Sequence, residues 1–597
     1  MDIFELPPLV VSDPNSNITD LLVDRAAKTP NLPLFALESD KGFQNVTALQ
    51  FLNEVKSLAK GLIASGIQPS QTVAIMSRTR YEWTLVDFAI WFAGGITVPI
   101  YETSSASQME WILSDSDSVA LFAENIEHVQ RFEQIKASVP LVRSVMTFEN
   151  GDLEELKRRG KEISDELVEQ RRKISKLNEL ATIIYTSGTT GKPKGCELSH
   201  RGFVELSKNA TIDLSDVIVE GRSTVLFLPL AHVFARFVEV LCVHGGIRIA
   251  FQPDSSQVAV TFEKFKPEFI LAVPRVFEKV YNSAEQKAEA SGKGDIFRRA
   301  AAVAIAWSEA LDTKRGPSTK LALQHFVFDK LVYKKIRAAM GGKLQYVISG
   351  GAPLGSRLGH FFRAIGVIVL EGYGLTETTA PATISRPATL KIGKVGQPLP
   401  GTGMKIAADG EIWTNGHNIM LGYWRNEKAT AEVLQDGWFA TGDIGTIDED
   451  GYLAITGRKK ELIVTAGGKN VAPAVLEDPL RAHPIIGQAV VIGDNLPFVS
   501  ALISLDPEML PIWLKNHGGD NTLSLTQAAK LPLVIAAIQN AIDEVNSQVS
   551  KAESIRKFVI IDRELNEASG HLTPSLKIKR NVVVADFATA IDEIYNR

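Results

Sequence analysis

Residues 182–195, Thr-Ile-Ile-Tyr-Thr-Ser-Gly-Thr-Thr-Gly-Lys-Pro-Lys-Gly, form the run whose chemistry is easiest to interpret. An apolar segment leads into a loop of glycines and hydroxyl side chains, to which Lys192 and Lys194 add positive charge. Glycines let backbone N–H groups turn toward one point, hydroxyls add donors, and such a loop favours phosphate. The spacing between Gly188 and Gly191 is shorter than in the common phosphate loop. The run predicts a polyphosphate-binding loop, with an ordinary surface loop as the alternative.

Five further segments contain residue types suited to the same ligand. In chain order they are Ser349 to Pro353, Glu371 to Thr378, Phe439 to Asp443, Gly457 to Glu461 and Leu572 to Arg580. Tyr373 offers an aromatic face, and Glu377 offers a hard oxygen ligand for Mg²⁺ beside phosphates. Asp443 follows a turn, where its carboxylate could accept two ribose hydroxyls. Each residue has an ordinary alternative role as a cap, a core aromatic or a surface charge, but together they predict a nucleotide site.

The elements that must position these residues follow an α/β rhythm. Strand-like runs at 72–76, 96–100, 119–123, 145–148 and 182–185 alternate with helix-like segments such as 82–94. This alternation predicts layered α/β structure with a parallel sheet. Charged residues 150–178 predict a solvated helix.

The pattern of predicted secondary structure changes after residue 393. Short strands broken by Asp-Gly turns predict a small β-rich subdomain with hairpins. After residue 460, strands at 489–492, 500–504 and 557–561 and a helix around 533–549 predict a compact α+β domain.

Composition sets the outer limits. A chain of 597 residues exceeds one hydrophobic core, so roughly two to four domains are expected. A net charge of -5 argues against nucleic acid as a partner. Two cysteines fit a reducing compartment. No apolar run reaches the roughly 18 residues of a membrane span. We expect a cytoplasmic protein, with any membrane contact peripheral, at the inner face of the plasma membrane.

Residues 298–343 carry ten basic and three acidic side chains, interleaved with aromatic residues. Two interpretations stay open for this zone. It is either a solvated helical face or a surface that meets anionic lipid headgroups.

Taken in this order, the segments resemble the adenylate-forming superfamily of AMP-binding enzymes, from about residue 20 to the end. That superfamily includes acyl-CoA synthetases, luciferases and nonribosomal peptide adenylation domains. Residues Leu228 to Arg236, Ala272 to Glu278 and Leu572 to Lys577 are most similar to bacterial long-chain fatty acyl-CoA synthetases. The resemblance implies a large N-terminal adenylation domain over 1–456, a hinge at 457–460 and a small mobile C-terminal domain over 461–597.

The resemblance also implies a reaction. ATP activates a fatty acid to acyl-AMP with release of pyrophosphate, and coenzyme A then takes the acyl group and releases AMP. ATP, Mg²⁺ and coenzyme A are the implied cofactor and co-substrates. Preferred chain length stays open, as does the choice between monomer and homodimer.

Residue roles follow from the resemblance by position. The implied catalytic residues are Lys577, Glu377, Thr376 and His232, with Glu377 also the metal ligand. The implied ATP and AMP contacts are Thr186, Ser187, Gly188, Thr189, Thr190, Gly191, Lys192, Lys194, Gly351, Ala352, Glu371, Gly372, Tyr373, Gly374, Asp443 and Arg458. Lys460 matches the hinge and Gly467 the coenzyme A tunnel. Leu576 departs from the glycine that the superfamily usually has before the late lysine.

Other functions remain as alternatives. A fatty acyl-AMP ligase would load a carrier protein instead of coenzyme A. A non-catalytic fatty-acid-binding protein would keep the scaffold without the reaction. A phosphate-loop kinase would release ADP, and oxidation of the adenylate, as in luciferases, shares the same motifs.

Overall fold

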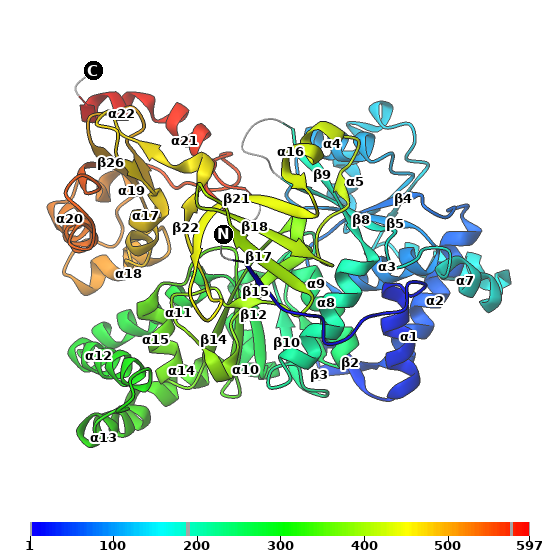
Figure 1. The fold of residues 1–597 in the computed structure, drawn as a ribbon, viewed down its shortest axis with the longest axis horizontal. Coiled ribbons are helices and arrows are strands. Elements are labelled where there is room, and N and C mark those ends of the chain that lie inside the picture. The colour runs from blue at the N-terminus through cyan, green and yellow to red at the C-terminus, as the bar shows by residue number, and fades with distance from the viewer. Residues whose placement is uncertain (1–2, 187–191, 574–576, 596–597) are drawn as a thin grey trace.

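The computed structural model describes residues 3–186, 192–573 and 577–595 (Figure 1). It is a mixed α/β protein with a large N-terminal region and a smaller C-terminal region, which confirms the predicted fold class. In Figure 1 the C-terminal region, coloured orange to red, lies next to α11 (Pro274–Ala290) of the N-terminal region.

The largest sheet has seven strands in the order β19-β9-β8-β5-β4-β6-β7. They are β4 (Thr72–Met76), β5 (Ile96–Ile100), β6 (Ala120–Ala123), β7 (Ser144–Thr147), β8 (Leu180–Thr186), β9 (Lys194–Ser199) and β19 (Gly422–Tyr423). Strands β4 to β8 are parallel to one another, whereas β9 pairs antiparallel with both β8 and β19. The five predicted strands correspond to β4 to β8 and differ only at their ends.

Both faces of this sheet are buried. In β4, Val73 and Ile75 pack with α2 (Ala48–Ala64) and α3 (Tyr81–Phe92), while Ala74 and Met76 pack with α4 (Ala106–Asp115) and α5 (Ile126–Glu133). Successive side chains of a strand point to opposite faces, so a strand covered on both faces needs a continuous apolar run. That is why short apolar runs were enough to predict the parallel sheet.

The prediction of one solvated helix over 150–178 is wrong. The structure has two helices, α6 (Asp152–Arg159) and α7 (Asp165–Arg172), separated by a short turn. In that turn a Cβ on Gly160 would lie 2.4 Å from the backbone nitrogen of Gly61, so this turn packs backbone to backbone on α2. Arg172, at the end of α7, is buried.

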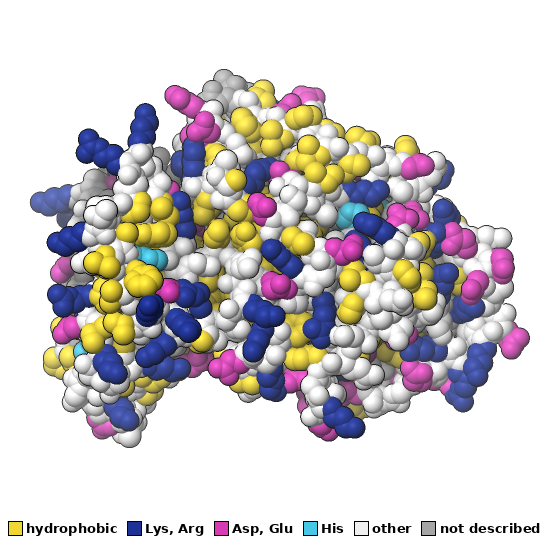
Figure 2. All heavy atoms as spheres, turned by 90° about the horizontal axis from the view of Figure 1, so that it is seen from below, with side chains coloured by type: hydrophobic (Ala, Val, Ile, Leu, Met, Phe, Trp, Pro, Cys, Tyr) yellow, Lys and Arg dark blue, Asp and Glu magenta, His cyan; other side chains and the backbone are white. Residues whose placement is uncertain are grey.

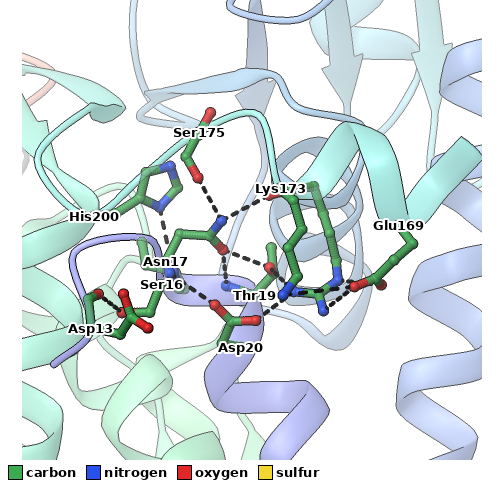
Figure 3. Close-up of polar contacts among 11 residues, drawn as sticks. Asp13, Ser16, Asn17, Thr19, Asp20, Glu169, Lys173, Ser175 and His200 are labelled. Carbon is green, nitrogen blue, oxygen red and sulfur yellow. Dashed lines mark hydrogen bonds and ion pairs between the residues drawn. The ribbon is translucent and has the colours of Figure 1, made fainter.

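The chain before the first long helix is tied down by polar contacts (Figure 3). Asn17 caps α1 (Ile18–Lys28): its side-chain oxygen accepts from the backbone of Thr19 at 2.9 Å. Its amide nitrogen donates to the carbonyls of Arg172 and Ser175, both at 2.7 Å. His200, at the start of α8 (His200–Asp213), accepts from the first N–H of α1 at 3.5 Å. Asn17 is buried, so these groups depend on protein partners rather than water.

Two further sheets complete the α/β part of the N-terminal region. One contains β10 (Ser223–Leu226), β11 (Arg248–Phe251), β2 (Pro33–Ser39) and β3 (Gly42–Thr47). The other contains β12 (Phe269–Ala272), β13 (Tyr346–Ser349), β14 (Ile368–Leu375), β15 (Ala380–Ile384) and β16 (Gln397–Pro398). Their helices are α9 (Val233–Gly245), α10 (Val258–Phe265), α11, α12 (Gly294–Leu311), α13 (Thr319–Phe328), α14 (Lys334–Ala339) and α15 (Ser356–Ala364).

The predicted β-rich subdomain is confirmed. Its sheet contains β1 (Ile3–Glu5), β17 (Thr402–Ile406), β18 (Glu411–Gly416), β20 (Leu434–Gln435), β21 (Trp438–Ile447) and β22 (Leu453–Arg458). Asp436 and Gly437 both have positive φ, 50° and 79°, and join β20 to β21. Two adjacent positive φ values are the geometry that makes Asp-Gly a hairpin signal. Helix α16 (Glu427–Val433) precedes this hairpin.

The C-terminal region has its own sheet and core. Strands β25 (Ile486–Ile492), β26 (Val499–Leu505) and β27 (Ile555–Ile560) form one sheet, and β23 (Ile463–Val464) and β24 (Asn470–Val471) form a hairpin. The helices are α17 (Pro473–Arg481), α18 (Met509–Asn516), α19 (Leu525–Ala528), α20 (Pro532–Asn546), α21 (Arg580–Asp586) and α22 (Ala588–Tyr595). The predicted helix and strands of this region are confirmed.

Buried side chains separate into the same two regions. Four hydrophobic clusters use described residues up to Leu453, and two others use described residues from Ile463 onward. Among the described residues, no helix has both the length and the apolar character needed to cross a membrane.

Candidate active site

Strands β21 and β22 place two predicted nucleotide contacts opposite each other. Asp443 and Arg458 are partners in the register of this hairpin, and Arg458 Nε donates to the Asp443 carboxylate at 2.9 Å. Tyr373, from β14, donates its hydroxyl to the other oxygen of Asp443 at 2.7 Å. Burial raises the pKa of Tyr373 well above its ordinary value, and Asp443 adds to the effect. The three side chains form one unit, and their contacts with ribose and adenine stay predictions.

The predicted adenine segment is an open loop after β13. Gly351 has a φ of +87°, and both Gly351 and Ala352 are exposed. Glu371 on the adjacent β14 is buried, and its carboxylate accepts from the backbone of Leu354 at 3.0 Å. Burial raises the pKa of Glu371. The carboxylate holds the loop against the strand end and leaves small residues facing outward.

Glycines of β14 permit a close approach to β15. A Cβ on Gly374 would lie 1.9 Å from the carbonyl oxygen of Ala380, and one on Gly372 would lie 3.0 Å from that of Thr383. These two predicted nucleotide residues therefore have a structural reason to be glycine. Any contact with ATP comes in addition to it.

Thr376 and Glu377 lie in a tight turn, Thr376–Thr378, that follows β14. The next two residues, Thr379 and Ala380, have positive φ values of 50° and 81°. Such conformations cost on the order of 1–3 kcal/mol each and gather at functional sites. The Glu377 carboxylate accepts from the hydroxyl of Tyr423 at 2.8 Å.

Glu377 fits the magnesium role as a single ligand. Within the described ranges, no group of three or more His, Cys, Asp or Glu side chains could hold a metal ion. Mg²⁺ beside phosphates is commonly held by one or two carboxylates, substrate oxygens and water rather than by a protein cage. The half-buried carboxylate of Glu377, joined through Tyr423 to Lys194 on the flank of the predicted loop, matches that donor set.

The centre of the predicted phosphate loop, Ser187, Gly188, Thr189, Thr190 and Gly191, lies outside the described residues. Its flanks are paired, with Thr186 of β8 opposite Lys194 of β9. Lys192 Nζ lies 4.1 Å from the ring centre of Trp111, and Lys194 Nζ lies 5.0 Å from that of Tyr423. Aromatic faces attract ammonium groups. Both lysines are exposed and so available to an anion.

Backbone contacts with residues 572 and 573 hold the segment that begins at Lys577. Leu572 and Ile578 form a bridge, Thr573 N donates to the carbonyl of Lys577 at 2.8 Å, and Lys577 N donates to Thr573 Oγ1 at 3.0 Å. Lys577 is exposed. The surrounding protein lowers its pKa, first by partial dehydration and then by the charge of Arg458.

The charges that act on Lys577 locate it in the site. Asp443 and Glu377 both oppose the lowering of its pKa, so both carboxylates lie within electrostatic reach. His232 caps α9, and its Nδ1 accepts from the backbone of Phe234 at 3.2 Å. Burial and the charge of Lys577 lower the pKa of His232 to about 4, so its imidazole is neutral at pH 7. Glu377, Asp443 and His232 therefore all lie within electrostatic reach of Lys577.

Ion pairs hold the C-terminal region in this position. Arg275, at the start of α11, bonds to Asp506 at 2.5 Å, and Lys279 bonds to Glu508 at 2.8 Å. Asn516 of α18 donates to the side-chain oxygen of Gln286 at 2.8 Å. These contacts lie on one face of α11.

The two remaining predicted residues lie away from these contacts. Lys460 is exposed in a short turn, Lys459–Glu461, between β22 and the C-terminal region. Gly467 is exposed in the turn between β23 and β24, where neighbouring Ala466 donates to Leu496 at 2.9 Å. The hinge and coenzyme A roles of these residues stay predictions.

Sequence reasoning missed a buried charge network next to β8, the strand that precedes the predicted phosphate loop. Arg236 is fully buried and binds both oxygens of Asp87 at 2.8 and 2.6 Å. It also donates to Thr182 of β8 at 2.6 Å, the strand that leads into the loop. Burial and nearby Asp87 raise the pKa of Glu239 to about 8. Charged residues inside the apolar run of α9 were the available signal, because such residues are rarely buried unless paired.

Comparisons with known proteins show the family to which the chain is similar. The family model of the AMP-binding enzymes matches residues 22–424, and that of the AMP-binding enzyme C-terminal domain matches residues 460–597. The long-chain-fatty-acid–CoA ligase FadD15 of Mycobacterium tuberculosis is 46% identical over 593 residues, covering 99% of this chain and 98% of that protein. The long-chain-fatty-acid–CoA ligase ACSBG2 of Xenopus laevis is 31% identical over 639 residues, covering 100% of this chain and 85% of that protein.

A solved structure shares the fold. The anthranilate CoA ligase AuaEII in complex with anthranoyl-AMP has a TM-score of 0.72 at 20% identity, covering 97% of this chain and 99% of that chain.

Proposed function

This chain belongs to the family of AMP-binding enzymes, and from that premise we propose that it is an AMP-forming long-chain fatty acid–CoA ligase. The observation that carries the proposal is the convergence of Lys577, Glu377 and Asp443, which come from distant parts of the chain. A binding protein would have no use for a lysine within electrostatic reach of two carboxylates from distant parts of the chain. An acyl-activating enzyme needs those charges where ATP reacts.

In the first step, a carboxylate oxygen of the fatty acid attacks the α-phosphorus of ATP. A bond to phosphorus forms, the bond to pyrophosphate breaks, and acyl-AMP results. Negative charge gathers on the phosphoryl oxygens in the transition state, where Lys577 and the lysines of the phosphate loop stabilise it. Lys577 also orients the two anions, whose mutual repulsion would otherwise keep them apart.

Glu377 is the residue that would hold Mg²⁺, and the ion, when bound, neutralises charge on the phosphates. Tyr423 fixes the orientation of that carboxylate through its hydroxyl. Asp443 and Arg458 hold the ribose end of the nucleotide, and Gly351 and Ala352 lie beside adenine. Neutral His232 separates the acyl chain from the nucleotide.

In the second step, the thiolate of coenzyme A attacks the acyl carbonyl carbon and AMP leaves. We assign the nucleotide and acyl sites to a domain over 1–456, the hinge to 457–460 and a moving domain to 461–597. Rotation about Lys460 withdraws Lys577 and presents Gly467. Separate hydrophobic clusters on either side of the hinge support this division, since neither core is disrupted by the movement.

The test is a panel of fatty acids from about C6 to C20 with ATP and Mg²⁺, scored with and without coenzyme A. We expect AMP, pyrophosphate and acyl-CoA in equal amounts, rising with chain length because each buried methylene contributes about 0.8 kcal/mol. Acyl-AMP that accumulates and passes only to a carrier protein would favour the acyl-AMP ligase. Release of ADP, or no nucleotide turnover, would refute the proposal.

We further propose that the enzyme makes peripheral contact with anionic membrane through α13 and the turn after it. Leu323, Phe326 and Val327 share one face of α13, and all three are exposed, as is Leu331. No described residue of α13 is buried. Figure 2, seen from below the view of Figure 1, shows apolar side chains among lysine and arginine side chains at its left, the end at which α12 and α13 lie.

Charge complementarity supports a lipid partner for this surface. Asp329 and Asp312 are paired with Arg337 and Arg363 at 2.6 Å each, so nearby lysines carry the net charge. Each basic residue near an anionic surface contributes about 1 kcal/mol.

Flotation with anionic vesicles provides the test. Binding should fall with salt, in a Lys330/Lys334/Lys335→Glu variant, and in a Leu323/Phe326→Ser variant. Vesicle binding that is unaffected by salt and by both variants would refute the proposal and indicate that residues 298–343 form an ordinary solvated face.

A further inference from the structure

Residues 418–424 lie between two parts of the phosphate site that are distant in sequence. On one side, Trp424 N donates to the carbonyl of Gly195 at 2.7 Å, beside the exit of the phosphate loop. On the other side, Met420 N donates to the carbonyl of Glu377 at 2.8 Å. The segment therefore joins strand β9 to the turn that carries Glu377.

Tyr423, within this segment, contacts both charged groups with one side chain. Its hydroxyl donates to Glu377 Oε1 at 2.8 Å, and its ring centre lies 5.0 Å from Lys194 Nζ. No ion pair within 4.0 Å joins Lys194 to Glu377 in the described part of the chain, although their charges are opposite. Tyr423 gives each group a partner and keeps them from neutralising each other.

The backbone around Tyr423 is fixed from several directions. Tyr423 is the register partner of Cys196 in β9. The indole nitrogen of Trp424 donates to the carbonyl of Asp115 at 2.8 Å. Thr379, one of the two strained residues after Glu377, donates its hydroxyl to the carbonyl of Asn418 at 2.8 Å. The segment therefore also holds the turn that aims the Glu377 carboxylate.

We propose that Tyr423 is a positioning residue for the phosphate and magnesium site, an inference that rests on the proposed function. It orients the carboxylate of Glu377 toward the metal and holds the ammonium of Lys194 toward the phosphates. Without the hydroxyl, Glu377 loses its oriented oxygen and is free to turn toward Lys194. Two groups that should meet Mg²⁺ and phosphate would then meet each other.

The test is the affinity for ATP by titration calorimetry, measured with Mg²⁺ and again with EDTA. Tyr423→Phe removes only the hydroxyl. We expect the gain in ATP affinity that Mg²⁺ produces to fall about tenfold, which is the size of loss that a hydrogen bond to a charged group gives. Affinity in EDTA should change less than about twofold. Tyr423→Leu, which also removes the ring, should weaken binding in EDTA as well.

Two further variants separate positioning from general damage. Tyr333→Phe removes a fully buried hydroxyl, which donates to the carbonyl of Ala300 at 2.7 Å, and should leave ATP binding unchanged. Glu377→Gln should itself lose the Mg²⁺ gain, and Tyr423→Phe should then add nothing to it.

The outcomes are distinguishable. An unaltered Mg²⁺ gain in Tyr423→Phe, or an equal loss in Tyr333→Phe, would overturn the inference alone. Failure of the unaltered protein to bind ATP would overturn the proposed function and this inference together.

Discussion

The ion pair between Arg275 and Asp506 should act as a latch for the arrangement that places Lys577 in the site. It joins the first turn of α11 to the start of α18 at 2.5 Å, and Asp506 is buried at 6% exposure. Asp506→Asn removes the charge but keeps an oxygen for the helix cap, to which the backbones of Glu508 and Met509 donate at 2.9 and 3.0 Å. The variant therefore isolates the interdomain contact from the folding of α18.

The expected loss of interaction free energy depends on the partners that Arg275 keeps in Asp506→Asn. A hydrogen bond to a charged group contributes roughly 1.5–3 kcal/mol net. Arg275 keeps Glu278 at 3.0 Å and the carbonyl of Arg481 at 3.3 Å, and it is partly exposed. The lower part of the range applies, so we expect about 1–2 kcal/mol. That corresponds to a roughly 5- to 30-fold shift of the equilibrium away from the observed arrangement.

The assay measures the two half-reactions in single turnovers. Acyl-AMP formation should slow in Asp506→Asn, whereas transfer from supplied acyl-AMP to coenzyme A should be retained or rise. Arg275→Gln should behave alike, and the double variant should show less than the sum of the two losses. Lys264→Gln, which breaks a 2.7 Å pair with Glu38 inside the N-terminal region, serves as the control. Equal loss of both half-reactions would refute the latch, since it would indicate damage rather than a shifted equilibrium.

Four other changes have defined outcomes. Lys577→Ala should lower acyl-AMP formation by roughly a hundredfold or more while leaving transfer from supplied acyl-AMP; equal losses in the two half-reaction assays would contradict its role. Lys460→Pro fixes φ at the pivot, so thioester formation should fall further than adenylate formation; normal acyl-CoA turnover would place the pivot elsewhere. The pKa of Glu239 is about 8 in the folded protein, above its ordinary value of 4.5, so the folded state keeps a proton that the unfolded state loses. The free energy of unfolding therefore falls as the pH rises from about 4.5 to 8. The stability of Glu239→Gln relative to the unaltered protein should therefore rise from pH 6 to 8, by up to about 1.4 kcal/mol per pH unit, as measured by denaturant titration. A difference in unfolding free energy that stays constant with pH would show that Glu239 is not protonated in the folded state. Asn17→Ala loses a helix cap and leaves two carbonyls without donors, which should cost roughly 2–4 kcal/mol of unfolding free energy, and a loss below about 1 would show that water replaces them.

Local patterns were sufficient wherever the local sequence decides the structure. A fully buried parallel strand must be apolar throughout, so β4 and β5 were predicted with their exact ends. Asp-Gly turns specify hairpins because both residues adopt positive φ, and β20 and β21 followed from Asp436-Gly437. The prediction of one helix over 150–178 failed because the backbone at Gly160 packs directly against α2. Helix propensity does not reveal such a tertiary contact.

In the candidate site, too, some residues could be predicted from the sequence and others could not. Asp443 and Arg458 lie fifteen residues apart on one hairpin, and the resemblance to a known family already pointed to both. Tyr423 was missed because long-range backbone pairing brings it to its partners: β19 pairs with β9, which carries Lys194, and Met420 N donates to the carbonyl of Glu377. Such long-range pairing leaves no periodicity in the sequence. Trp111, which contacts Lys192 from α4, was missed for the same reason.

The positively charged side chains at the candidate site fall into two groups: arginines paired with carboxylates, and lysines without such a partner among the described residues. Arg458 and Arg236 are committed to carboxylates, at 2.9 and 2.6 Å, and serve to hold the site in shape. Lys192, Lys194 and Lys577 have no carboxylate within 4.0 Å among the described residues. Aromatic rings contact the first two, and contacts with Thr573 hold the backbone of the third. A cation–π contact at an exposed site is worth about 0.5–1 kcal/mol, less than a hydrogen bond between charged groups. In the proposed reaction, a phosphate would bind these lysines without first breaking an ion pair, and most of their charge would be available to the transition state.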